Sequence, residues 1–341
     1  MVFVTGATGL VGSHLLYFLA ESGQEVTALR RSDSCLEACR AVFLQYPEGV
    51  VFWKRIRWVE GDVLDKGTLE SVVAESDCIY HCAAVVSFHG KDRGQLVTTN
   101  LRGTENVVVL ALKYGIRLCY VSSIAALGDA RNGESIDETT PETEDVEHSV
   151  YSHSKGDAEK IVWQYVEKGL NAVIVNPSVI LGAGMWGRSS TRLFMTAMKG
   201  VPFYTKGGTG YVDVRDVCRL MIRLAQDRRV TGERFVLNGE NCSYRELFLL
   251  VAQVAGKRGP FIYMAPWFTG IIWRMLAIGG KLMGKQPGFT RETARSAHRR
   301  SYYSSRKILD LYPGYRFYTL PETVQHIYQE YCRSYMNGVH L

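Results

Sequence analysis

Residues 2–12, VFVTGATGLVG, decide the fold of this chain. A short apolar strand runs into three glycines, Gly6, Gly9 and Gly12, which open a helix. Glycines at this spacing permit a tight turn, a close approach of phosphate to the backbone and close packing of helix on strand. The free N–H groups and the positive dipole end of the helix attract anions. The stretch therefore predicts a dinucleotide-binding turn, whose contacts would come from Gly6, Thr8, Gly9, Leu10, Val11 and Gly12.

Beyond this turn the chain alternates strands and helices. Further strands are expected at 25–29, 56–60, 78–82, 117–122 and 171–175, and helices at 9–21, 65–74, 96–114 and 150–168. This alternation predicts an α/β fold with a Rossmann-type doubly wound parallel sheet. After residue 176 the composition shifts to glycine and helical segments, which predicts a smaller, mainly helical C-terminal substrate lobe. We expect an NAD(P)-binding domain over 1–176 and a substrate-binding lobe over 177–341, continuous with the first and with chain exchange between the lobes.

Composition narrows the class of protein. The 341 residues are 46% hydrophobic and 22% charged, which excludes a disordered or low-complexity chain. We find no apolar run that predicts a spanning helix, no secretion signal and no zinc-site spacing among the eight cysteines, so we expect a cytoplasmic protein without a metal site. Residues 1–150 carry 13 Lys and Arg against 21 Asp and Glu, whereas residues 151–341 carry 27 against 13. The basic second half leaves open an anionic substrate, an anionic membrane surface or a solvated exterior.

The end of the second strand bears on the choice between NADP and NAD. An NAD site places a carboxylate there, about 20 residues past the glycines, to bind ribose hydroxyls. This chain has Arg30 at that place, and a guanidinium pairs a 2′-phosphate in bidentate geometry. The sequence therefore favours NADP(H). NAD is the alternative if Arg30 lies over the adenine and Asp33 reaches the ribose.

Two more strand ends complete the expected cofactor site. Asp62, which follows the third strand, would accept a hydrogen bond from the adenine amino group, with Val63 beside it. Ala83, Ala84 and Val85 follow the fourth strand, and their small size would let the backbone run close to the cofactor.

A tyrosine and a lysine open the long helix expected at 150–168. Tyr151 and Lys155 are four residues apart and share one helix face. Lowering a tyrosine pKa by about three units requires about 4 kcal/mol. An ammonium at about 4 Å, with an effective dielectric constant of about 20, supplies that much. The pair is thus a sufficient acid–base device, and a serine hydroxyl in the preceding VSSIAALG, residues 121–128, would polarise a substrate carbonyl.

These motifs together resemble the extended short-chain dehydrogenases/reductases of the NAD(P)-dependent epimerase/dehydratase group, and most of all its dihydroflavonol reductase and hydroxysteroid dehydrogenase branch. The resemblance rests on TGATGLVG, GDV, HCAA, NLRGT, VSS, YSHSK and NPSVILG, which span the first half of the chain. It implies that Ser123 hydrogen-bonds the substrate oxygen and that Tyr151 is the general acid in reduction and the base in oxidation. Lys155 would bind the nicotinamide ribose and lower the pKa of Tyr151, and Pro177 and Val179 would approach the carboxamide.

The expected function is that of an NADP(H)-preferring oxidoreductase, which moves a hydride between nicotinamide and a secondary alcohol or ketone on a largely apolar small molecule. Dehydratases of this family carry an Asp-Glu pair after the catalytic hydroxyl, where this chain has Ile124 and Ala125. One alternative is a nucleotide-sugar epimerase with tightly bound NAD, which the basic second half supports. The other is a catalytically dead cofactor-sensing protein, against which the intact Ser123, Tyr151 and Lys155 argue.

Residues 261–285, FIYMAPWFTGIIWRMLAIGGKLMGK, are rich in aromatic and large aliphatic side chains. They fit the wall of an apolar substrate pocket, a helix in weak peripheral contact with a membrane, or a subunit contact. The first two interpretations favour a lipophilic substrate. The resemblance implies a homodimer through the helices near 97–114 and 150–168, and a structural role for Asn100 in bracing the strand ends. No nucleic-acid partner is expected, because no recognition motif accompanies the positive charge.

Overall fold

The structure is a computed structural model that describes residues 1–86, 93–129, 134–141, 149–187, 189–282 and 291–336. The first half of the chain forms β1 (Val2–Thr5), α1 (Leu10–Glu21), β2 (Val26–Arg30), α2 (Leu36–Phe43), α3 (Gly49–Trp53), β3 (Arg57–Glu60), α4 (Lys66–Val73), β4 (Cys78–His81), α5 (Arg93–Val97), a π-helical turn (Thr98–Arg102), α6 (Gly103–Tyr114), β5 (Arg117–Val121), a 3₁₀ turn (Ile124–Ala126), α7 (Val150–Val166) and β6 (Ala172–Pro177). The second half forms β7 (Val179–Leu181), α8 (Ser189–Met198), β8 (Phe203–Tyr204), β9 (Gly208–Asp213), α9 (Val214–Gln226), β10 (Glu233–Leu237), β11 (Glu240–Ser243), α10 (Tyr244–Val254), β12 (Ile262–Tyr263), α11 (Pro266–Leu282), α12 (Arg291–Ser296), α13 (Arg306–Leu311) and α14 (Leu320–Met336).

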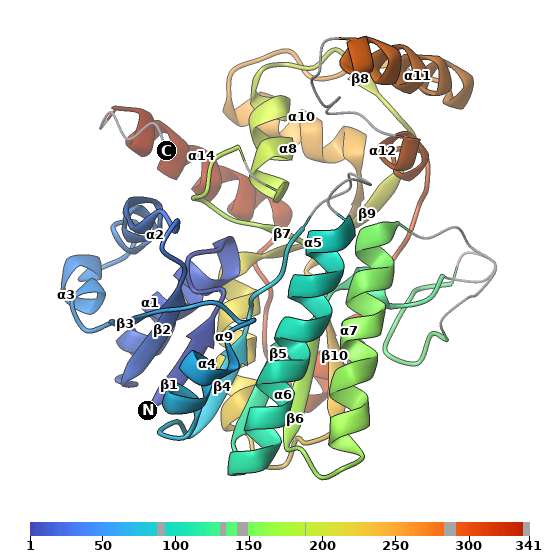
Figure 1. Ribbon diagram of the computed structural model, residues 1–341. Coiled ribbons are helices and arrows are strands. Elements are labelled where there is room, and N and C mark those ends of the chain that lie inside the picture. Colours follow the sequence, from blue (N-terminus) through green and yellow to red (C-terminus); the bar gives the residue numbers. More distant parts are fainter. Residues whose placement is uncertain (87–92, 130–133, 142–148, 188, 283–290, 337–341) are drawn as a thin grey trace.

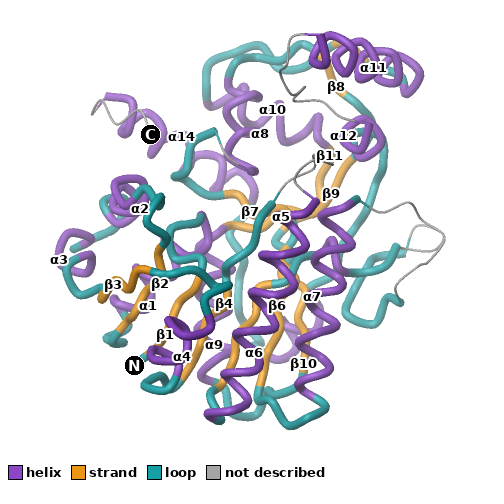
Figure 2. Tube along the Cα trace, in the orientation of Figure 1, coloured by secondary structure: helices purple, strands orange, loops and turns teal. Residues whose placement is uncertain are grey.

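Seven strands form one parallel sheet in the order β10-β6-β5-β4-β1-β2-β3, which Figures 1 and 2 show at the centre of the molecule. The six predicted strands are β1 to β6, each ending within two residues of the expected limit. The strand order reverses between β1 and β4, and ligands of such sheets bind in the crevice at the carboxyl ends of the strands beside this point. The predicted doubly wound α/β fold is confirmed.

Helices cover both faces of the sheet because its strands are apolar on both sides. In β1, Phe3 packs into the layer under α4, α6 and α7, whereas Val4 packs into the layer under α1 and α9. Successive side chains of a strand point to opposite faces, so a continuous run of apolar residues feeds two cores. Figure 1 shows α6 and α7 side by side on one of these faces. This two-sided burial holds the strand ends rigidly in place.

The C-terminal lobe lies over the carboxyl edge of the sheet and is mainly helical, as predicted (Figure 1). A small three-stranded sheet, β11-β9-β7, forms its base, and a two-stranded pair, β12-β8, lies further out. Helices α8, α10 and α14 close over the small sheet around a core that contains Phe194, Tyr211, Leu247 and Val324.

The second half of the chain also returns to the main sheet. Strand β10 pairs in parallel with β6, placing Val236 opposite Asn176, while α9 packs against α1 and α13 against β10. The sequence patterns predicted neither this seventh strand nor helices α2 and α3. Strand β10 consists of the five residues ERFVL, two of them charged, and so short a segment carries no local sign of its distant partner. The helix expected over 96–114 is interrupted by the π-helical turn at Thr98–Arg102. The boundary between residues 176 and 177 stays a prediction for where the substrate lobe begins.

Candidate active site

The glycine turn lies where β1 meets α1. Gly6 has a φ of +65°, and a Cβ added there would lie 2.5 Å from the backbone nitrogen of Ala83. A Cβ on Gly12 would lie 2.2 Å from the carbonyl oxygen of Gly6, so α1 packs too closely for any larger residue. Gly9 precedes the helix and has no side chain with which to cap it. The turn is thus shaped to bring a diphosphate against backbone N–H groups, which is the fit that a dinucleotide cofactor requires.

The backbone after β4 is held beside this turn by one buried amide. Asn100 accepts a hydrogen bond from the N–H of Val85 at 2.7 Å and donates to the carbonyl of Val85 at 3.1 Å. Its amide nitrogen also donates to the hydroxyl of Ser154 on α7, at 3.1 Å. Asn100 therefore braces the strand ends, as the sequence led us to expect, and it ties the segment containing Ala83 and Ala84 to the helix that carries Tyr151.

A buried histidine supports the same strand ends from below. His81 shares hydrogen bonds with Thr5 at 2.6 Å and with Thr104 at 3.1 Å. Burial lowers the pKa of His81 to about 3, so its ring is neutral at physiological pH. The Thr5 hydroxyl also accepts a long hydrogen bond, 3.4 Å, from the N–H of Ala83. The three side chains thus link β1, β4 and α6 under the turn.

At the opposite end of the expected cofactor site, Arg30 forms an ion pair with Glu60. Its guanidinium lies 2.8 Å from the carboxylate of Glu60, the residue opposite it on β3, and its side chain is 27% exposed. Asp33 pairs with Arg31 at 3.1 Å. The hydroxyl of Thr8 lies 3.4 Å from Ser34, which places the loop after β2 against the glycine turn. The charge of the Arg30 guanidinium is thus shared with Glu60, and its pairing with a 2′-phosphate stays a prediction.

The remaining predicted cofactor contacts lie at neighbouring strand ends. The carboxylate of Asp62 accepts a hydrogen bond from the N–H of Leu64 at 2.9 Å, and the side chain of Val63 is buried. Pro177 ends β6, and the next strand, β7, begins at Val179. All of these positions follow parallel strands of the main sheet, at its carboxyl edge.

Tyr151, Ser123 and Lys155 come together at this edge. A hydrogen bond joins the side chains of Tyr151 and Ser123. Lys155, one turn further along α7, is 3% exposed and donates a hydrogen bond to the carbonyl of Val121 at 2.9 Å. Ser149 caps α7 by accepting from the N–H of Ser152 at 3.0 Å, so the helix begins directly before the tyrosine.

Burial shifts the pKa values of Tyr151 and Lys155 in opposite directions. Burial raises the pKa of Tyr151, and the hydrogen bond from Ser123 offsets only part of that rise. Burial also lowers the pKa of Lys155 to about 8, against the attraction of Cys82 and Glu159. The Lys155 ammonium donates to the Val121 carbonyl, and desolvation is the largest cause of both shifts. Tyr151 is therefore protonated at neutral pH. That Lys155 lowers the pKa of Tyr151 stays a prediction.

A buried carboxylate on α7 organises the two serines. Glu159 is 3% exposed and accepts hydrogen bonds from the hydroxyl of Ser122 at 2.5 Å and from the amide of Asn176 at 2.8 Å. The same amide nitrogen lies 3.1 Å from the carbonyl of Ser123. The guanidinium of Arg234, on β10, lies 3.1 Å from the other carboxylate oxygen. Glu159 thus fixes the backbone of Ser123 through Asn176 and draws its countercharge from the seventh strand.

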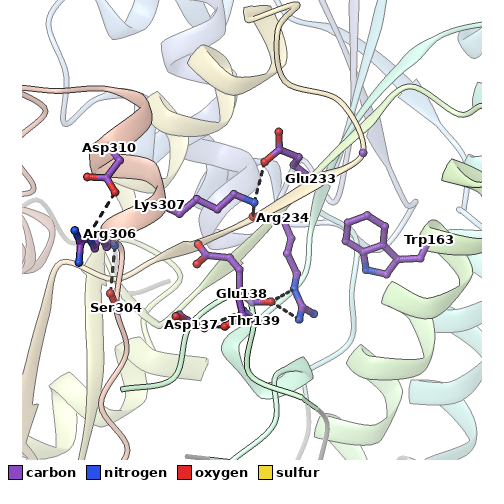
Figure 3. A pocket seen from close by; sticks show the side chains of 11 residues that line it. Asp137, Glu138, Thr139, Trp163, Glu233, Arg234, Ser304, Arg306, Lys307 and Asp310 are labelled. Carbon is purple, nitrogen blue, oxygen red and sulfur yellow. Dashed lines mark hydrogen bonds and ion pairs between the residues drawn. The ribbon is translucent and has the colours of Figure 1, made fainter. Parts of the chain in front are cut away.

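The outer end of this network borders a surface hollow of about 760 Å³, drawn in Figure 3. Trp163 donates to Glu159 at 3.2 Å and faces the hollow from α7. Arg234 donates to the carbonyl of Glu138 at 2.6 and 3.0 Å. Lys307 pairs with Glu233 at 2.9 Å, so charges lining the hollow are paired with each other. The hollow lies at the edge strand β10, which contributes Glu233 and Arg234 to its lining.

Glu159, Asn176 and Arg234 were not predicted from the sequence as parts of the site. Glu159 lies one turn beyond Lys155 on the same helix face, and this spacing was the signal that could have identified it. Its partners on β6 and β10 had no such signal. Among the described residues, no group of three or more His, Cys, Asp and Glu side chains is placed to hold a metal ion.

The fold, the glycine turn and the Ser–Tyr–Lys set define a dinucleotide-dependent α/β enzyme. A sequence profile of the NAD dependent epimerase/dehydratase family matches residues 2–237. The chain therefore belongs to this family, as an NAD(P)-dependent oxidoreductase of the reductase and dehydrogenase type.

Similar proteins carry reductase and dehydrogenase names. The chain is 30% identical to a putative dihydroflavonol 4-reductase of Synechocystis over 318 residues, which cover 89% of this chain and 87% of that protein. It is 29% identical to a 3-beta-hydroxysteroid dehydrogenase of Mycolicibacterium neoaurum over 208 residues, 59% of this chain and 51% of the relative. The crystal structure of gox2253 has a TM-score of 0.79 at 29% identity and covers 98% of each chain.

Proposed function

We propose that this protein is an NADP(H)-preferring oxidoreductase that interconverts a ketone and a secondary alcohol on a largely apolar small molecule. The observation that carries the proposal is the hydrogen-bonded pair of Tyr151 and Ser123, with Lys155 one turn away, at the sheet edge beside the glycine turn. The names of the Synechocystis and Mycolicibacterium relatives support this class of reaction.

A bound nicotinamide cofactor supplies or accepts the hydride. Tyr151 donates its phenolic proton to the substrate oxygen in reduction and takes it back in oxidation. The Ser123 hydroxyl donates a hydrogen bond to the same oxygen and polarises the carbonyl. Lys155 binds the nicotinamide ribose. Tyr151 is protonated at neutral pH, because the ordinary pKa of a phenol is about 10 and burial raises it further, so the side chain carries the proton that reduction requires.

The residues proposed to hold the cofactor follow the strand ends. The diphosphate would lie on the glycine turn, where Gly6 and Gly12 leave no room for a Cβ. The adenosine end would meet Arg30 and Asp62, and the nicotinamide end would meet Pro177 and Val179. The full set is Gly6, Thr8, Gly9, Leu10, Val11, Gly12, Arg30, Asp62, Val63, Ala83, Ala84, Val85, Tyr151, Lys155, Pro177 and Val179.

NADP preference depends on Arg30 and is opposed by Glu60. Arg30→Asp is expected to lower the NADPH-to-NADH ratio of kcat/KM by about tenfold or more, because charge-assisted hydrogen bonds to a phosphate are lost. Glu60→Gln frees the guanidinium, so the Kd of NADPH should fall several-fold while that of NADH is unchanged. Arg57→Asp, at the amino end of β3, is the matched control and should leave the ratio unaltered. A ratio that survives Arg30→Asp would refute the 2′-phosphate assignment.

The decisive test of the reaction is a panel of ketones and secondary alcohols assayed with NADPH and NADH, with nucleotide sugars as the comparison set. Turnover of apolar ketones is the expected result. Epimerisation of a nucleotide sugar, by protein that purifies with non-exchanging NAD, would instead favour a nucleotide-sugar epimerase. The basic second half of the chain supports that alternative. Cofactor binding without turnover of any member would favour a sensing protein instead.

Two further expectations complete the proposal. The resemblance implies a homodimer through the helices near 97–114 and 150–168, so light scattering is expected to give about twice the 38.3 kDa mass of the chain. A cytoplasmic location also stays a prediction, to be checked by cell fractionation.

A further inference from the structure

Helix α11 carries large apolar side chains on its outer side. Trp267, Ile271 and Met275 follow one another at four-residue spacing and are 69%, 46% and 66% exposed. The inner side of the helix is different, because Thr269 is buried and hydrogen-bonds His298 at 2.9 Å. The interpretation of this segment as a pocket wall does not describe these outward side chains. A solvent-facing stripe of this size indicates a contact surface.

Neighbouring elements extend the stripe. Strand β12 pairs with β8 at the same end of the lobe, where Figure 1 shows β8 beside α11. We call the whole surface the apolar end. Its exposed members are Phe203, Phe261, Ile262, Tyr263, Trp267, Phe268, Ile271, Met275 and Leu276.

The sequence around the apolar end is basic and lacks acid. Between Glu246 and Glu292 there is no Asp or Glu, and the charged residues are Lys257, Arg258, Arg274, Lys281, Lys285 and Arg291. Two cations lie against aromatic rings of the apolar end. The guanidinium carbon of Arg258 lies 3.9 Å from the ring centroid of Phe261. Lys206, which precedes this run, places its ammonium 5.0 Å from the ring of Tyr263.

We propose that the apolar end docks on an anionic lipid surface, with α11 lying in the plane of the interface. Aromatic and aliphatic side chains facing outward, rimmed by Lys and Arg, are the pattern of a helix that lies on a membrane. No described helix is long and apolar enough to cross one. A two-fold contact between two copies would place the cations of one apolar end against those of the other, because such an interface pairs a surface with itself. An anionic lipid surface complements both the apolar and the positive features.

The test is flotation of the purified full-length protein with vesicles of phosphatidylcholine alone and with about 30% phosphatidylglycerol. Binding to the anionic vesicles is expected, weakening with added salt and far weaker on the neutral ones. Trp267→Ser combined with Ile271→Ser should weaken binding about tenfold or more. Each substitution removes the favourable free energy of transferring an apolar side chain from water into the lipid interface. Leu44→Ser, which removes a 51% exposed apolar side chain elsewhere, is the matched control and should bind as the parent does.

Charge variants separate the electrostatic part. Arg258→Gln with Arg274→Gln should lower anionic-vesicle binding about tenfold, whereas Arg306→Gln, on α13, should not. Turnover of a water-soluble ketone, unchanged in all variants, shows that the fold is intact. Equal binding to both vesicle types, or none to either, would overturn the proposal. So would an oligomer that dissociates when Trp267 and Ile271 are replaced, which would make the apolar end a contact between copies.

Discussion

The carboxyl edge of the sheet and the apolar end of the lobe differ in how far their side chains are exposed to solvent. At the edge, Glu159, Asn100 and Lys155 are nearly inaccessible, and each is hydrogen-bonded to a residue distant in the chain. At the apolar end, Trp267 and Met275 project into solvent. The proposed reaction requires side chains whose positions are fixed by burial and hydrogen bonds. The proposed contact with a lipid surface requires side chains that remain accessible. Substitutions in the two regions should therefore affect different measurements.

The largest effect is expected from Tyr151→Phe. Removal of the proton donor should lower kcat by about 10²- to 10⁴-fold, while the Kd of NADPH stays within several-fold of the parent value. Steady-state kinetics and fluorescence titration measure the two quantities. Tyr165→Phe, on the same helix, is the control, and its kcat and its Kd for NADPH should be close to the parent values. Loss of cofactor binding or of the folded state in Tyr151→Phe would mean that the tyrosine is structural.

A smaller effect is expected from Glu159→Gln. The glutamine amide keeps the size of the side chain but loses the charge that pairs with Arg234. Its NH₂ group would also face the Asn176 amide nitrogen, so that two hydrogen-bond donors oppose each other. The backbone of Ser123 should then be held less firmly, so kcat should fall about tenfold with little change in KM. Unfolding should cost about 1–3 kcal/mol less.

Glu167→Gln, at the exposed end of the same helix, provides the comparison for Glu159→Gln. A loss of stability with an unaltered kcat would show that Glu159 supports the fold alone and does not position Ser123.

The third effect concerns acid. Burial lowers the pKa of His14 to about 4 and that of His81 to about 3, so both take up protons in the unfolded chain before they do so in the folded one. Their contribution to stability is therefore present above about pH 6.5 and declines below it. The slope approaches about 1.4 kcal/mol per pH unit for each histidine. Denaturant titrations between pH 7 and pH 4 measure it.

A matched pair tests the assignment of this slope. His81→Gln should flatten the acid limb, whereas His153→Gln, which replaces an exposed histidine, should leave it as steep as before. An identical slope in both variants would remove His81 from the explanation.

The smallest effect is expected at the apolar end. Trp267→Ser removes a side chain that is 69% exposed, so the free energy of unfolding should change by less than about 0.5 kcal/mol and turnover of a soluble ketone should be unaffected. Thermal denaturation and a standard assay measure both. A large loss of stability or of turnover in Trp267→Ser would mean that the apolar end and the sheet edge do not act independently.

Much of the fold followed from patterns within a few residues of each other. The apolar run and glycines of 2–12 predicted β1, the turn and α1, and the spacing of Tyr151 and Lys155 predicted one shared helix face. These inferences were accurate because strand alternation, glycine geometry and helical periodicity are local properties of the chain. The exposed face of α11 was not accessible in the same way, since an apolar helix has the same sequence whether it is covered or not.

What the sequence determined by itself, then, was the doubly wound α/β class, the dinucleotide turn and the residue types at the sheet edge. Only the tertiary structure decided which groups hold them. Glu159 meets Ser122, Asn176 and Arg234 across 37, 17 and 75 residues of chain, and the last arrives on a seventh strand supplied by the second half. Arg30 likewise meets Glu60 through the pairing of β2 with β3. The physical reason is that such partners are selected by packing over the whole molecule, in which low-dielectric burial makes each unpaired polar group costly.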